Sequence, residues 1–267
     1  MDSSDSIREK SQVQFGKTAT DYVTSVHHAK SDDLEAMVRL ASEQFEGGLH
    51  KKRVLDVATG GGHTALAFSR AGANVVASDI TPEMLDAASS FISKEVTAKI
   101  DFQLAAAENL PFKQDSFDVI TCRIAPHHFA DPKAFVSEAA RVLAPGGILV
   151  VVDIVSPEDS ELNRILNYIE KKRDPSHVKA YTVRRWVNWF AGACLEVTHI
   201  ERFFREKGYR DWVERSQTDS TVTDRLERYI LDLPQNARDY LRVTQDGDRL
   251  ATLANQAGLF ISTSYSK

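Results

Sequence analysis

The sequence is short of cysteine, of long apolar runs and of positive charge, and each shortage excludes a class of protein. Its two cysteines, Cys122 and Cys194, form neither a disulfide framework nor a metal-binding spacing. A membrane span needs about 18 uninterrupted apolar residues, and no such run occurs. Basic residues number 33 against 38 acidic ones, a net charge of −5. That balance disfavours nucleic acid as a partner, because phosphate contacts need a basic face.

The remaining composition is that of an ordinary globular protein. Apolar residues make up 42% and charged residues 27% of the chain, enough for a core of enzyme size. The polar N-terminus, M-D-S-S-D-S-I-R-E-K, lacks the apolar segment of a signal peptide. The scarcity of cysteine fits a reducing compartment. We therefore expect a cytoplasmic protein.

Residues 53–68, R-V-L-D-V-A-T-G-G-G-H-T-A-L-A-F, are the most informative stretch. The apolar run at 54–58 is typical of a strand buried on both faces of a parallel sheet. Three glycines, 60–62, follow at once, and 64–68 is predicted to be a helix. Glycine allows positive φ and close approach to a ligand, and a helix N-terminus offers unpaired N–H groups. Strand, glycine turn and helix together indicate a nucleotide-binding arrangement.

Asp56 lies inside this apolar run and indicates the kind of ligand. A buried carboxylate is costly unless it is paired or hydrogen-bonded, and it would repel a pyrophosphate at the neighbouring turn. It would favour a cation. S-adenosylmethionine, which carries a sulfonium and an ammonium but no phosphate, fits this requirement.

The segment D-V-A-T-G-G-G resembles the acidic-x-x-x-Gly-x-Gly signature of class I S-adenosylmethionine-dependent methyltransferases. The resemblance implies an α/β fold, with a Rossmann-like, seven-stranded, mostly parallel sheet whose last strand is antiparallel. It also implies helices on both faces and a helical insertion between strands five and six. Asp56, Gly60 and Gly62 are the first candidate cofactor residues.

The second predicted strand, 73–79, ends in Asp79, which is 23 residues after Asp56 and so one β-α-β unit away. An acid there can accept both ribose hydroxyls of an adenosine-type ligand. Ile80 follows at the position that would cover the adenine face. Asp79 and Ile80 are therefore candidate cofactor residues.

Residues 105–112, A-A-A-E-N-L-P-F, resemble the adenine-edge loop of the family, whose usual sequence is Asp-Ala-Glu-x-Leu-Pro-Phe. Ala106 departs from this pattern, because it occupies the position where an aspartate often receives the adenine amino group. Adenine recognition is then expected from backbone groups at Ala106 and Ala107, with Glu108 as a further candidate.

A narrower resemblance is carried by C-R-I-A-P-H-H-F at 122–129 and R-D-P-S-H-V at 173–178. Both are similar to the methyltransferase type 11 enzymes related to ubiquinone and menaquinone biosynthesis, over roughly residues 10–215. Arg123 follows the fourth predicted strand at its carboxyl end, where ligands bind in doubly wound sheets, so it is a candidate for lining both cofactor and substrate. The resemblance adds Tyr22 as a cofactor residue, in an N-terminal segment starting at Phe15 that such enzymes fold over the cofactor as a lid.

The function implied by the resemblance is methyl transfer to oxygen, carbon or nitrogen of a small molecule by in-line displacement, with no metal. If the acceptor must lose a proton, a histidine of near-neutral pKa suits the role of base. We rank His128 first, then His127, then His177. The acceptor and the oligomeric state, a homodimer included, are left open.

We expect one domain over 1–267. It comprises a lid at about 10–48, a cofactor-binding core at 49–155, a helical substrate roof at 157–194, and strands and helices at 195–267. Two alternatives stay open. Gly60-x-Gly62-x-x-Ala65 also satisfies the weak G-x-G-x-x-G/A pattern of nicotinamide-dependent oxidoreductases. The other alternative is a member of the methyltransferase family that binds the cofactor but does not catalyse methyl transfer.

Overall fold

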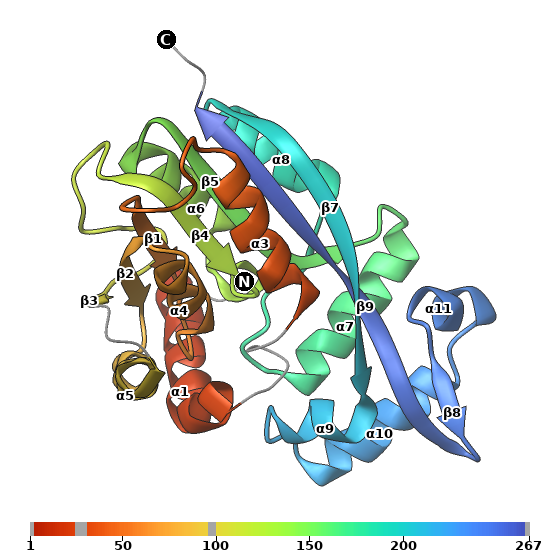
Figure 1. Cartoon of the computed structure of the whole chain (residues 1–267). Helices are drawn as coiled ribbons and strands as arrows, with labels where there is room; N and C mark the ends of the chain where they lie inside the picture. Colours follow the sequence, from red (N-terminus) through yellow and green to blue (C-terminus); the bar gives the residue numbers. More distant parts are fainter. Residues whose placement is uncertain (1–2, 25–30, 96–99, 265–267) are drawn as a thin grey trace.

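The computed structural model describes residues 3–24, 31–95 and 100–264, leaving aside the side chains of 18–24 and 95 (Figure 1). One mixed sheet runs through the molecule with helices on both sides. Its main path is, in spatial order, β3 (Asp101–Leu104), β2 (Asn74–Asp79), β1 (Arg53–Val57), β4 (Phe117–Arg123), β5 (Leu143–Ser156), β9 (Arg249–Ser264) and β7 (Leu195–Gly208). The first five strands are parallel, and β9 is antiparallel to both β5 and β7. The predicted α/β fold with one antiparallel strand is confirmed.

Two short strands raise the number of described strands above the seven expected. β6 (Tyr181–Thr182) pairs with β5, and β8 (Thr244–Asp246) pairs with β9. The helices are α1 (Ser4–Thr24), α3 (Asp32–Glu43), α4 (His63–Arg70), α5 (Pro82–Glu95), the 3₁₀ helix η1 (Pro126–His128), α6 (Pro132–Val142), α7 (Ser160–Arg173), α8 (Val183–Gly192), α9 (Tyr209–Glu214), α10 (Ser220–Leu231) and α11 (Gln235–Tyr240).

Strand β1 is buried on both faces, as the apolar run predicts. Val54 packs into the core on one side of the sheet, whereas Leu55 and Val57 pack into the core on the other. The strand order reverses beside β1, with β2 on one side and β4 on the other. Such a reversal opens a crevice at the carboxyl ends of parallel strands. The glycine turn, residues 60–62, lies at this crevice because it directly follows the carboxyl end of β1.

Strands β7 and β9 are long, with 14 and 16 residues. They run as a two-stranded ribbon beyond the rest of the sheet toward α9, α10 and α11 (Figure 1). A separate apolar core, which includes Tyr209, Trp212 and Leu253, packs there. The ribbon therefore builds a second side of the molecule next to the crevice.

The middle of the chain has two further features. Residues 144–147, A-P-G-G, have the composition of a turn, but β5 already begins at Leu143. In the predicted insertion, Trp186 and Phe190 are fully buried and contact Phe260 of β9. These aromatic side chains are therefore core.

Candidate functional site

The glycine turn needs glycine for two separate reasons. Gly62 has φ +82°, and a Cβ there would lie 2.7 Å from Ile92 Cδ1 and 3.1 Å from Ala88 Cβ, so α4 and α5 could not pack as they do. Gly60 has φ +53°, but an added Cβ would meet nothing within 4 Å. Gly60 therefore leaves open space beside the turn, whereas Gly62 allows close helix packing.

Asp79 connects the end of β2 to this turn. Its Oδ2 accepts the Gly60 N–H at 3.0 Å and its Oδ1 accepts the Thr81 N–H at 2.9 Å. Burial raises the pKa of Asp79, although these backbone donors oppose the shift. Both Asp79 and Gly60 line a cavity with an open volume of about 970 Å³, which we name the first cavity.

Asp56 lies beneath the turn and does not line the first cavity. Its Oδ2 accepts the Thr59 hydroxyl at 2.7 Å and its Oδ1 accepts the Thr121 hydroxyl at 2.8 Å. Burial raises the pKa of Asp56 to about 6, and the two hydroxyls limit the rise. The carboxylate thus supports the loop from below. Its predicted direct attraction of a cationic ligand would act through that loop, and stays a prediction.

The loop expected at the adenine edge forms another wall of the first cavity. Ile80, Ala107 and Glu108 line it. The Glu108 carboxylate is held in place: its Oε1 accepts N–H groups of Ala130 and Asp131 at 3.1 and 3.3 Å, and its Oε2 lies 3.5 Å from an Arg8 guanidinium nitrogen. Glu108 therefore joins this loop to the turn at 130–131 and to α1.

Arg123, at the carboxyl end of β4, lines the first cavity but is strongly anchored. Its guanidinium lies 3.2 Å from Asp33 Oδ2 and donates to Ser31 Oγ at 3.2 Å and Thr64 Oγ1 at 3.1 Å. Burial alone would raise the pKa of Asp33, but the charges of Arg123 and Arg205 outweigh it, and the pKa is lowered. Ser31 occupies the N-cap position of α3 but makes no side-chain cap hydrogen bond.

The three candidate histidines cluster, but they occupy different positions. The ring centroids of His127 and His128 are 4.1 Å apart, and those of His127 and His177 are 5.4 Å apart. Of the three, only His128 lines the first cavity. His127 Nδ1 is bound to Asp153 Oδ1 at 2.5 Å, and His177 Nε2 to Asn167 Oδ1 at 3.1 Å.

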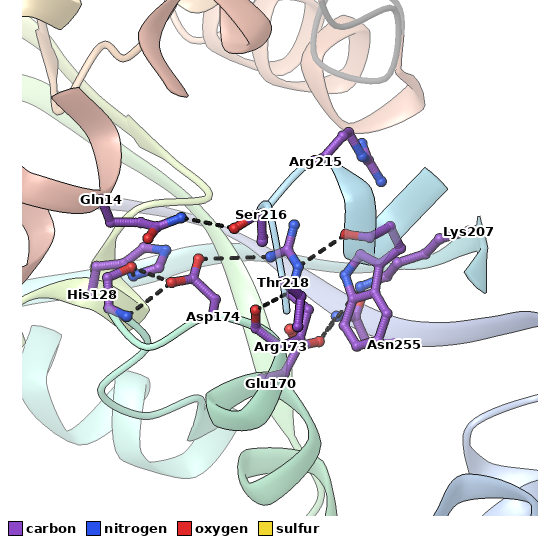
Figure 2. A network of polar contacts seen from close by, with 12 residues as sticks. Gln14, His128, Glu170, Arg173, Asp174, Lys207, Arg215, Ser216, Thr218 and Asn255 are labelled. Atoms are coloured by element: carbon purple, nitrogen blue, oxygen red, sulfur yellow. Dashed lines mark hydrogen bonds and ion pairs between the residues drawn. The ribbon is translucent and has the colours of Figure 1, made fainter. Parts of the chain in front are cut away.

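His128 has a hydrogen-bonded relay behind it. Its Nδ1 lies 3.0 Å from Ser176 Oγ, and that hydroxyl donates to Asp174 Oδ1 at 2.5 Å. Burial and the neighbouring His127 lower the pKa of His128 well below its usual value. Figure 2 shows His128 and Asp174 at one end of a polar network that continues through Arg173. The ring is therefore neutral at pH 7 and fixed in orientation.

The comparisons with known proteins agree with this geometry. Residues 55–151 match a family model described as a methyltransferase domain. The chain is 36% identical, over 87% of its own length and 90% of the other protein, to the Bacillus subtilis protein named uncharacterized methyltransferase YcgJ. The crystal structure of B. subtilis YcgJ superposes with a TM-score of 0.82 at 33% identity, covering 87% of this chain and 97% of that one.

The chain belongs to the class I S-adenosylmethionine-dependent methyltransferases. A ubiquinone biosynthesis O-methyltransferase of Xanthomonas campestris is also similar, with 40% identity over 42% of this chain and 47% of that protein. The methyltransferase is therefore an enzyme of the expected family and not a nicotinamide-dependent oxidoreductase, for which Gly60-x-Gly62-x-x-Ala65 was the sequence argument.

Helix α1 contributes three residues to the wall of the first cavity. Phe15 belongs to the expected lid segment, whereas Arg8 and Ser11 were not predicted as site residues. Tyr22 belongs to the same helix, but its side chain lies outside the described residues. Ile124 follows β4 with φ +55°, which a β-branched residue rarely adopts, and its N–H donates to Val152 O at 2.7 Å. Only the spacing of Phe15 from Tyr22 gave a signal in the sequence.

A second cavity, with an open volume of about 1060 Å³, adjoins the first. Ile124 and His128 line both cavities, whereas His127 lines only the second. His177 lines neither, so its predicted catalytic role gains no support from its position.

The described part of the methyltransferase has neither a metal-binding cluster nor a helix able to span a membrane. There, no group of three or more His, Cys, Asp and Glu side chains is arranged to hold a metal ion. Nor, over the same residues, is any helix both long enough and apolar enough to cross a membrane.

Proposed function

We propose that this methyltransferase uses S-adenosylmethionine in the first cavity to methylate a small molecule that loses a proton to His128. The observation that carries the proposal is the meeting of the glycine turn, Asp79 and His128 around this one cavity. The cofactor supplies, when bound, an electrophilic methyl group on a sulfonium. The residues described below would bind the cofactor, orient the acceptor and remove its proton.

The cavity walls fit the cofactor. Gly60 leaves open the space that a Cβ would fill, so a ligand can approach the backbone of the turn. The Asp79 carboxylate already accepts two backbone N–H groups, and its remaining lone pairs suit the ribose hydroxyls. Ile80 offers an apolar surface for adenine, and the backbone at Ala107 is suited to its edge.

The relay behind His128 assigns its tautomer. Ser176 has one hydroxyl proton, which goes to the Asp174 carboxylate, so its oxygen accepts the Nδ1 proton of His128. The other ring nitrogen, Nε2, then carries a lone pair and can take a proton from the acceptor. Among the described residues, none is recorded as bonded to Nε2. Burial keeps the ring neutral, which is the form a general base requires.

A small acceptor is favoured by the cover over the cavity. Arg8, Ser11 and Phe15 of α1 line the first cavity. Helix α1 is held there by Gln12, whose Nε2 donates to Ile80 O at 2.9 Å, and by Arg8 beside Glu108. A covered cavity excludes water and suits a metabolite better than a surface side chain of a folded protein.

The test has two parts. Calorimetric titration should show binding of S-adenosylhomocysteine and none of NAD. Incubation with methyl-tritiated S-adenosylmethionine and a metabolite extract should then move label into a small molecule, and the His128→Asn variant should bind the cofactor product but transfer little label. Absence of S-adenosylhomocysteine binding would refute the proposal, and binding without any transfer would favour the non-catalytic alternative.

A further inference from the structure

The second cavity is lined by an unusual number of cationic side chains. Arg173, Arg205, Lys207 and Arg215 all face it. Two of its acids are buried, Asp33 and Glu170, while the other two, Asp32 and Glu206, are exposed to solvent. Water screens the exposed acids, so the interior of the cavity is left with more positive than negative charge.

The register of the β7–β9 ribbon explains why two of these cations, Arg205 and Lys207, lie on the same face. Side chains alternate between the two faces of a strand, so Arg205 and Lys207 share one face of β7 and the exposed Glu206 lies on the other. Arg205 pairs directly with Asn255 of β9, which places that buried amide on the same face. The cationic face of the ribbon is therefore turned toward the cavity.

The buried acids of this cavity already have partners. Glu170 Oε1 accepts the Asn255 side-chain amide at 2.7 Å and lies 3.5 Å from Lys207 Nζ (Figure 2). Burial alone would raise the pKa of Glu170, but Lys207 and other nearby cations hold it at about 2. Asp33 is paired with Arg123, as described above. Neither carboxylate needs a further cation.

Arg205 differs from its neighbours. Arg173 donates to Trp212 O at 3.1 Å, and Arg215 donates to Asp211 O at 3.3 Å. For Arg205, the structure records no hydrogen bond or ion pair with any described residue, although the carboxylates of Asp33, Glu170 and Asp153 act on its charge. Burial lowers the pKa of Arg205, yet an arginine stays charged at pH 7. A half-buried guanidinium facing a cavity without a hydrogen-bonding partner is suited to an anionic ligand.

We infer that the second cavity binds an anionic group of the methyl acceptor, a carboxylate or a phosphate, and that Arg205 is its principal partner. This inference rests on the proposed function, because the acceptor must also reach His128. That side chain lines both cavities, so a molecule anchored at Arg205 can extend past it toward the first cavity. Arg205 would then determine specificity without taking part in the chemistry.

The experiment uses the full chain, methyl-tritiated S-adenosylmethionine and a metabolite extract. The labelled product should be retained on a quaternary-ammonium resin at pH 7. Treatment with alkaline phosphatase distinguishes the two sources of charge, since it abolishes retention of a phosphate monoester and leaves that of a carboxylate. A product that is not retained is neutral or cationic, and would overturn the inference.

Variants then test the residue with the purified acceptor fraction. Arg205→Gln should lower kcat/KM about 10- to 100-fold, mostly through KM, because a charged hydrogen bond is lost. Arg205→Lys should keep part of the kcat/KM that Arg205→Gln loses. The matched control is Arg202→Gln, which alters an exposed arginine on the opposite face of the same strand. Equal kinetics for the Arg205 and Arg202 variants would contradict the assignment, and unchanged S-adenosylhomocysteine affinity excludes misfolding.

If no label is transferred, the proposed function fails and the anion site is judged separately. Benzoate and inorganic phosphate, tested at fixed ionic strength with benzamide as the neutral control, should raise the Tm of the wild type more than that of Arg205→Gln. Equal shifts for wild type and variant would then overturn the inference.

Discussion

Phe15 stands edge-on against His128, with 4.9 Å between the ring centroids and the planes nearly perpendicular. One helix therefore contacts the proposed base directly. The same helix reaches both sides of the molecule, because Gln12 donates to Ile80 O near β2 and Gln14 donates to Ser216 O beyond α9 at 3.1 Å. Helix α1 thus links the cover of the first cavity to the orientation of His128.

The contact predicts an effect on ligand release. Replacing Phe15 with alanine removes an aromatic pair worth about 0.5–1.5 kcal/mol, so S-adenosylhomocysteine should dissociate roughly 2- to 10-fold faster. Stopped-flow displacement measures this rate. Val13→Ala, on the same helix but 52% exposed, is the control and should dissociate at the wild-type rate. Identical rates for all three proteins would show that α1 does not retain the ligand.

The position of His128 predicts a selective loss of turnover. His128→Asn should reduce kcat by about 10²- to 10⁴-fold, the usual contribution of a general base, with little change in cofactor affinity. His177→Asn is the comparison, since His177 lines neither cavity and is bound to Asn167. It should cost stability rather than turnover at a temperature where the variant is folded. Equal losses of kcat in the two variants would show that His128 is not the general base.

The protonation of His128 predicts the pH profile. Its pKa is lowered by burial first and by His127 second, so the ring stays neutral well below pH 6.5. The kcat of the wild type should therefore be constant from pH 8 to about 6.5 and fall only at lower pH, provided the fold persists. Steady-state rates at saturating substrates, with circular dichroism at each pH, measure it. A fall of kcat that starts above pH 6.5 would contradict this protonation state.

The two glycines of the turn predict two different defects. Gly62→Ala forces a Cβ to within 2.7 Å of Ile92 and keeps a positive φ, so it should destabilise the fold by about 2–4 kcal/mol. Gly60→Ala carries only the backbone cost of about 1–2 kcal/mol, but its methyl group enters open space beside the first cavity. Denaturant titration and calorimetry with S-adenosylhomocysteine separate them. Loss of affinity should dominate at Gly60, and loss of stability at Gly62; the reverse ranking would refute the distinction.

Asp56 predicts how stability changes with pH. Burial raises its folded-state pKa from 3.8 to about 6, so the folded protein holds this proton more tightly than the unfolded chain does. Its contribution to stability is fully present below about pH 4 and is lost as the pH rises through 6. Relative to Asp56→Asn, the free energy of unfolding of the wild type should fall by about 3 kcal/mol between pH 4 and pH 7.5, at 1.36 kcal/mol per pKa unit.

Urea unfolding of both proteins at the two pH values measures this difference. Asp118→Asn is a control of opposite sign, because Arg53 outweighs the effect of burial and lowers the pKa of Asp118. Its wild-type contribution develops as the pH rises toward 3.8, so it should stay nearly constant, and not shrink, between pH 4 and pH 7.5. A difference between wild type and Asp56→Asn that does not change with pH would exclude a raised pKa at Asp56.

The parts of the methyltransferase that the sequence predicted depend on local patterns. The strand at Val54–Val57, the glycine turn and Asp79 lie within two consecutive β-α units, where apolar periodicity and turn residues determine the structure. The strand order and the antiparallel β9 came from the resemblance to a family, because pairing between distant strands leaves no local signal.

Other parts depend on contacts between distant residues and could not be predicted in this way. Nothing in the sequence around Arg205 indicates that Asn255 is its cross-strand neighbour. No local pattern supports the ranking of His128 above His127, and only the fold shows that, of the two, His128 alone lines the first cavity. Ser31 has the features of a helix cap, but tertiary structure uses its hydroxyl to anchor Arg123 instead. In each case a long-range partner decides the role.

The ribbon of β7 and β9 lies outside the segment that matches the family model, which ends at residue 151. Gly60 and Asp79 belong to that segment, whereas Arg205 and Asn255 belong to the ribbon. The residues proposed to hold the methyl donor and the residue proposed to select the acceptor thus lie on separate parts of one enzyme. If Arg205 selects the acceptor as proposed, substitutions along the ribbon would change which compounds are methylated and leave the donor site unaltered.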